Sequence, residues 1–102
     1  MTGRQIGLTN FLLEAGPLEF WDIVKQTAYL YGLKEPRSAL VRDLNYLLEV
    51  EALRLEVRTK EPSTENWLHV NLEWPTQITE TEFFRRAREL PKGKTLRFLA
   101  RS

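Results

Sequence analysis

The sequence has 102 residues, of which 42% are hydrophobic and 28% are charged, and this composition suits one folded domain better than a disordered chain. It contains no cysteine and a single histidine, His69, which excludes disulfides, thiolate metal sites and imidazole clusters for zinc. No apolar run approaches the length of a membrane span, and the N-terminus lacks the apolar core of a secretory signal. We therefore expect a cytoplasmic protein that binds neither metal nor membrane.

The charge is unevenly distributed along the chain. Residues 1–84 carry eight basic and 13 acidic side chains, a net charge of −5, whereas residues 85–102 carry seven basic and one acidic, a net charge of +6. Any attraction to phosphate should therefore come mainly from the C-terminal tail. The alternative is that the tail neutralises the acidic body of its own fold.

The first three predicted elements are helices. Residues 4–15 place apolar side chains at helical spacing until a Gly-Pro pair ends the pattern. Residues 18–32 again have one apolar face and end in a glycine. The third predicted helix covers residues 36–49, because Pro36 suits the first turn of a helix.

The predicted helix over residues 36–49 has two different sides. Its leucines recur at positions i, i+4, i+7 and i+8, which commits one side to a core. At 100° per residue, four polar side chains lie opposite that stripe and two further side chains lie along its flank. The opposite side holds Ser38, Arg42, Asn45 and Glu49, and the flank holds Arg37 and Val41.

After residue 52 the period of the apolar pattern changes from near 3.6 to 2. LRLEVR, residues 53–58, and WLHVNLEW, residues 67–74, both alternate between apolar and polar side chains. The segment between them is polar, so the pattern predicts an antiparallel hairpin with a flexible tip.

A fourth helix is predicted over residues 79–90. Thr79 and Glu82 form the T-x-x-E pattern of a capping box at its start. Its apolar side would pack on the first helix or on a second copy of the protein, and it consists of Phe83, Phe84, Ala87 and Leu90. Residues 91–102 are expected to be frayed or extended, with a few apolar side chains able to dock.

The order of three helices and a hairpin, with almost no loop after the third helix, resembles the winged helix-turn-helix family. The resemblance rests on GPLEFWDIV, PRSALVRDLNYLLEVEALRLEV and WLHVNLEW. It implies an α+β fold in which residues 1–75 form a three-helix core with a two-stranded β-wing, while residues 76–102 add a C-terminal helix and a basic tail. A weaker similarity is to winged-helix modules appended to Fic-family enzymes, whose catalytic histidine motif this chain lacks.

The resemblance implies binding to duplex DNA and a role in transcriptional regulation. In this family the third helix usually lies in the major groove and the wing touches the backbone. Arginine can donate two hydrogen bonds to guanine, and asparagine can pair with adenine through both atoms of its amide. The expected groove contacts are Arg37, Ser38, Val41, Arg42 and Asn45. The expected phosphate contacts are Arg58 and Lys60 in the wing and Arg85, Arg86, Arg88, Lys92 and Lys94 in the tail.

Acidic side chains near the third helix and in the wing leave a second hypothesis open. In it, the winged-helix shape binds a protein partner, for example as an accessory to a Fic-type enzyme, and does not bind DNA. A continuous positive surface would favour DNA, whereas an apolar patch around Trp67 or Phe84 would favour a protein. A homodimer through the C-terminal helix is a further hypothesis. Scattered glycines, and serines without a neighbouring base, give no sign of an enzyme, so we expect neither catalytic residues nor a cofactor.

Overall fold

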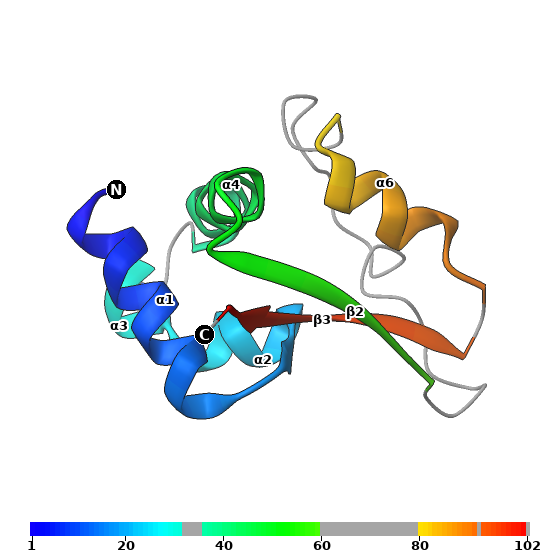
Figure 1. The fold of residues 1–102 in the computed structure, drawn as a ribbon, viewed down its shortest axis with the longest axis horizontal. Coiled ribbons are helices and arrows are strands. Elements are labelled where there is room, and N and C mark those ends of the chain that lie inside the picture. Colours follow the sequence, from blue (N-terminus) through cyan, green and yellow to red (C-terminus); the bar gives the residue numbers. More distant parts are fainter. Residues whose placement is uncertain (32–35, 60–79, 92, 102) are drawn as a thin grey trace.

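A computed structural model describes residues 1–31, 36–59, 80–91 and 93–101. Figure 1 shows helices packed around a small antiparallel sheet, which confirms the α+β class. Several sequence predictions fall outside the described residues, namely the strand over 67–74, Lys60, Trp67, His69 and Lys92, and so does the side chain of Arg37. No helix in the described part of the chain is long and apolar enough to cross a membrane.

Helix α1 (Gly3–Ala15) confirms the first predicted helix. It begins with a capping box in which the side chains of Thr2 and Gln5 each accept a hydrogen bond from the other residue's backbone N–H. It ends at Gly16, whose φ of 79° is accessible to glycine without strain. Its buried side chains, Leu8 and Leu12, join the core.

The second predicted helix is wrong as a single element. The segment forms the short strand β1 (Leu18–Glu19), helix α2 (Phe20–Gln26) and the one-turn helix α3 (Ala28–Tyr31). The break lies at Thr27, whose hydroxyl donates a hydrogen bond to the carbonyl of Ile23 at 2.6 Å and whose φ of −107° departs from helical geometry. This break turns α3 away from the axis of α2.

Helix α4 (Pro36–Glu49) confirms the third predicted helix and leads into strand β2 (Leu53–Thr59) within three residues. The backbone N–H groups of Glu51 and Ala52 donate to carbonyls of the last helical turn. Glu51 adopts a φ of 62°, the left-handed conformation that closes such a Schellman-type end. The tight ending fixes the direction in which β2 leaves α4.

Strand β3 (Lys94–Ala100) is the centre of the sheet, which has the order β1-β3-β2 and is antiparallel throughout. It comes from the segment that the sequence predicted to be frayed or extended. Leu96 and Phe98 are both buried and the residue between them, Arg97, is only half-buried, so the segment has the period of a strand. Among the described residues β2 pairs with β3, and the predicted partner strand over 67–74 lies outside them.

Helix α6 (Glu82–Glu89) confirms a C-terminal helix that packs on the same core as the other helices. The predicted capping box is wrong, because Thr81 is the N-cap and makes no side-chain cap bond, so Glu82 is the first residue of the helix and not the third after the cap. The ring of Phe83 meets that of Phe98 edge to face, with 5.5 Å between the centroids. Figure 1 shows α6 and α4 on the same side of β2. Three side chains of the predicted apolar face, Phe83, Phe84 and Ala87, are buried within this chain, so they are not available to a second copy.

Candidate nucleic-acid interface on α4 and α6

The side of α4 that faces solvent carries most of the predicted groove contacts. Arg42 is exposed, while Ser38 and Asn45 are half-buried. Val41 has no exposed surface and belongs to the core, so it is not placed to face a groove as the sequence predicted. The reason is that this β-branched apolar residue lies beside the leucine stripe and is covered together with it.

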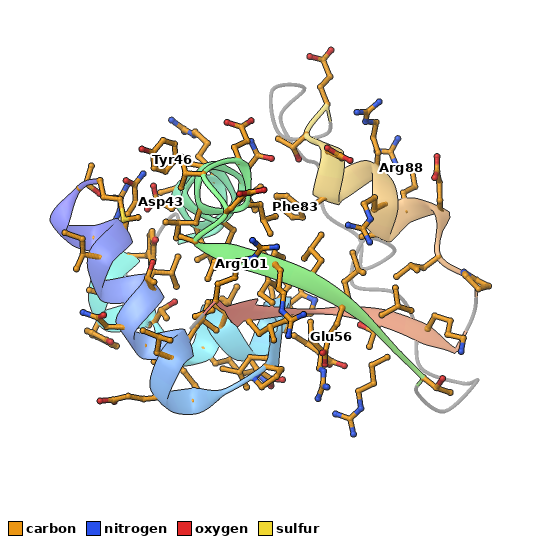
Figure 2. All side chains as sticks on the ribbon, viewed as in Figure 1. Asp43, Tyr46, Glu56, Phe83, Arg88 and Arg101 are labelled. Atoms are coloured by element: carbon orange, nitrogen blue, oxygen red, sulfur yellow. The ribbon has the colours of Figure 1, made fainter. Side chains whose placement is uncertain are left out.

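Sequence reasoning missed Tyr46, which is 38% exposed on α4 one turn after Arg42. Figure 2 shows its side chain pointing away from the sheet. A further contact on the same surface joins Asn45 to Glu49, because the Asn45 Nδ2 donates a hydrogen bond to the Glu49 Oε1 at 3.2 Å. The spacing i, i+4 could have indicated this pair.

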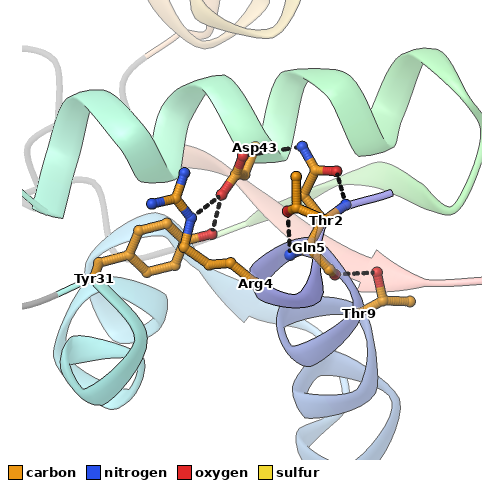
Figure 3. A network of polar contacts seen from close by, with 6 residues as sticks. All are labelled: Thr2, Arg4, Gln5, Thr9, Tyr31 and Asp43. Atoms are coloured by element: carbon orange, nitrogen blue, oxygen red, sulfur yellow. Dashed lines mark hydrogen bonds and ion pairs between the residues drawn. The ribbon is translucent and has the colours of Figure 1, made fainter.

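The opposite flank of α4 is held by Asp43, which is only 5% exposed (Figure 3). Its carboxylate accepts hydrogen bonds from the Arg4 Nε at 2.8 Å, the Gln5 Nε2 at 3.1 Å and the Tyr31 hydroxyl at 2.6 Å. The Arg4 guanidinium also lies 4.9 Å from the centre of the Tyr31 ring. The Asp43 network therefore joins α1, α3 and α4 through one carboxylate.

The chemistry of Tyr31 suits this arrangement. Burial raises the pKa of its hydroxyl above the ordinary value, and the hydrogen bond to Asp43 raises it further. The hydroxyl therefore remains a donor while the carboxylate remains an acceptor. Because the bonds are directional, the network fixes the rotation of α4 about its own axis and hence the direction of Arg42.

The burial of Asp43 could have been predicted from its position in the sequence, although its charge suggests an exposed residue. Asp43 lies three residues after Leu40 and four before Leu47, so it shares the helical side that enters the core. A carboxylate on such a side must be paired, because an isolated buried charge costs too much free energy.

A groove of about 660 Å³ separates α4 from α6, with β2 along its floor. Apolar side chains, among them Leu53 and Phe83, form its base. Asn45 and Glu49 line it from α4, and two arginines line it from α6. The groove thus brings the predicted base contact Asn45 near two predicted phosphate contacts, Arg85 and Arg86.

The basic residues of the C-terminal segment fall into different settings. Arg85, Arg86 and Arg88 are all exposed on α6, and the Arg88 guanidinium stacks 5.3 Å from the ring centre of Phe84. Lys94 and the predicted wing residue Arg58 are exposed at the far end of the β2–β3 pair.

Two further basic side chains neutralise acids of the same fold. Arg97 forms an ion pair with Glu56 across the β2–β3 pair, and Arg101 lies 4.0 Å from Glu51. These two arginines of the tail therefore neutralise acidic side chains of the same fold, as the alternative hypothesis for the tail predicts. Among the described residues no three His, Cys, Asp or Glu side chains are grouped so that they could hold a metal ion.

Comparison of the chain with protein-family models, with curated proteins and with solved structures found no match.

Proposed function

We propose that this chain is a winged-helix domain that binds duplex DNA and acts in transcriptional regulation. Three observations are compatible with that layout: helices α1 to α4 precede β2, α4 runs directly into β2, and β2 pairs antiparallel with β3. In this proposal residues 60–93, which contain α6, connect the two strands of the wing.

The observation that carries the proposal is the pairing of two polar helix surfaces on one side of β2. An α-helix fits the major groove of B-DNA, and α4 presents Arg42 and Asn45 outward while its other sides are packed. Across the groove, α6 presents two exposed arginines, Arg85 and Arg86, next to Glu82. Base contacts from α4 and phosphate contacts from α6 would then act together.

This proposal changes the main source of phosphate contacts. The sequence assigned that role jointly to the wing and the tail. Arg85 and Arg86 line the same groove as Asn45, whereas Arg58 and Lys94 lie at the far end of the strands. We therefore assign the phosphate contacts beside the recognition helix to α6, and a second, more distant set to Arg58 and Lys94.

One observation favours the second candidate, a surface for a protein partner. Tyr46 lies on α4 and Val50 directly follows its last residue, one turn further along, and the two are 38% and 46% exposed. Together with the acidic Glu49 they make a partly apolar surface of the kind that interfaces use. Of the two residues around which the sequence predicted an apolar patch, Phe84 is buried and Trp67 lies outside the described residues, so this candidate rests on the surface at the end of α4.

The test is fluorescence anisotropy with a labelled duplex of random sequence at about 50 and 200 mM salt, where neutralised phosphates make binding fall steeply. The double variant Arg85→Ala/Arg86→Ala should bind more weakly, and its salt dependence should be shallower by about two charges. Lys25→Ala, which removes an exposed charge from α2, is the matched control and should bind as wild type does.

Failure of the wild type to bind at the lower salt would overturn the DNA proposal. The Tyr46→Ala/Val50→Ala variant would then be compared with wild type in a search for a protein partner. If Lys25→Ala lowered the affinity as much as the double variant does, binding would depend on positive charge in general. That result would contradict the assignment of phosphate contacts to α6.

A further inference from the structure

Glu49 is an unexpected residue on a surface that would approach DNA, because its negative charge repels phosphate. It nevertheless has a specific contact there, since its Oε1 accepts the hydrogen bond from the Asn45 Nδ2. Both side chains line the groove opposite the arginines of α6. The acid is therefore placed beside the one amide that the sequence predicts to read a base.

An asparagine side chain can present its oxygen and nitrogen in two orientations that differ by a flip of the amide. Reading adenine requires one of them, in which the Oδ1 faces the N6 amino group and an N–H faces N7. The amide nitrogen carries two hydrogens, so a bond to Glu49 uses one and leaves the other for the base. The flipped amide would direct the Oδ1 at the Glu49 carboxylate, where acceptor meets acceptor.

We propose that Glu49 is a positioning residue that fixes the amide of Asn45 for reading adenine in the major groove, an inference that rests on the proposed DNA-binding function. Arg42 precedes Asn45 by three residues on the same solvent side of α4. At a rise of about 1.5 Å per residue the two Cα atoms are about 4.5 Å apart along the axis. Arg42 and Asn45 could therefore reach bases of the same short stretch of a duplex.

This arrangement separates affinity from specificity. Removing the acid should strengthen binding to any duplex, because one repulsive charge is lost. The same change should weaken the preference for adenine, because the amide is then free to flip. A merely structural role for Glu49 would not move the two quantities in opposite directions.

The experiment selects duplexes from a random library with the wild-type chain and then measures each variant on the selected site. For each variant, discrimination is the Kd for the site with its adenine pair replaced, divided by the Kd for the selected site. Glu49→Ala should lower discrimination roughly tenfold and bind random duplex more tightly than wild type. Glu49→Gln can present either an oxygen or an N–H to Asn45 and therefore does not exclude the flipped amide, so it should lose discrimination as Glu49→Ala does. Glu51→Gln, which removes a charge from the same groove, should change only the affinity for random duplex.

Asn45→Ala should lose more discrimination than Glu49→Ala, because it removes the amide itself. Wild-type discrimination in Glu49→Ala or in Glu49→Gln would overturn the inference, because the acceptor-only carboxylate would then not orient the amide. The inference would also be overturned if the selected sites had no fixed adenine. The proposed DNA binding would still stand in that case, provided that binding depends on salt. Absence of binding by wild type would instead reject the proposed function itself.

Discussion

The two flanks of α4 are held in different ways. Toward α1 and α3, three side-chain donors converge on the buried carboxylate of Asp43. Toward α6, the helices are separated by a groove of about 660 Å³, and α6 is attached to the core below it by Phe83 and Phe84. The first flank is held by directional polar contacts. The second is held by buried apolar side chains, and charged side chains line the open groove above them.

The difference indicates how a small domain can fix a helix and still leave a surface for a ligand. Hydrogen bonds to Asp43 are sensitive to the rotation of α4, because their strength depends on angle and distance. Apolar contact between rings is less directional and supplies most of its free energy through burial. We expect substitutions on the α6 flank to change stability most, and substitutions on the Asp43 flank to change the rotation of α4.

The largest effect is expected from Phe83→Ala, which empties a fully buried site on the α6 flank and removes the ring contact with Phe98. The free energy of unfolding should fall by about 3–5 kcal/mol, measured by urea denaturation followed by far-UV circular dichroism. Arg86→Ala is the matched control on the exposed side of α6 and should change stability by less than about 0.5 kcal/mol. A loss below about 1 kcal/mol for Phe83→Ala, against the several expected for a buried ring, would mean that this ring does not anchor α6.

A smaller effect is expected from Asp43→Ala. The substitution leaves the Tyr31 hydroxyl and the Gln5 amide without their acceptor, whereas Arg4 is 45% exposed and can be solvated. The expected cost is therefore about 2–3 kcal/mol, less than for a fully buried ion pair. Asp43→Asn retains one acceptor oxygen and should cost less than alanine. Equal costs in the two variants, measured by the same denaturation, would show that the acceptor role is unimportant.

The sequence predicts the elements that local chemistry defines. The Gly-Pro pair that ends α1, the proline that opens α4 and the alternation in β2 all identify their elements without knowledge of the rest of the chain. Thr27 was misread because it fits the apolar spacing of a continuous helix, although its hydroxyl bonds to the backbone and breaks the helix. Strand β3 was missed because the consecutive apolar residues Phe98, Leu99 and Ala100 break its alternation, and its place between β1 and β2 depends on pairing with distant residues.

The candidate site was predictable only in part for the same reason. Helical angles alone place Arg42 and Asn45 on the solvent side of α4. They do not reveal that α6 packs beside this helix, which brings Arg85 and Arg86 to the same groove. Val41 was misplaced because a flank position is exposed or buried according to neighbours that come from elsewhere in the chain.

The smallest effect expected concerns Tyr31 and depends on pH. Tyr31→Phe removes the hydroxyl that donates to Asp43, and it should cost about 1.5 kcal/mol at neutral pH. In the wild type, burial first and the Asp43 hydrogen bond second raise the pKa of Tyr31 above its ordinary value of about 10. The folded state therefore holds this proton after the unfolded state has lost it. The stabilisation is complete below about pH 10 and declines as the pH rises further.

The difference in unfolding free energy between wild type and Tyr31→Phe should consequently be constant from pH 7 to about 9 and narrow between about 10 and 11. Urea denaturation at each pH measures it, and the other tyrosines cancel because both proteins contain them. Tyr29→Phe, which alters a 72% exposed side chain on the same helix α3, is the control and should show no such narrowing. A difference that stayed constant through pH 11 would mean that the Tyr31 hydroxyl ionises equally in the folded and unfolded chain. The hydrogen bond to Asp43 would then not favour the protonated hydroxyl, and the directional part of the Asp43 network would rest on Arg4 and Gln5 from α1.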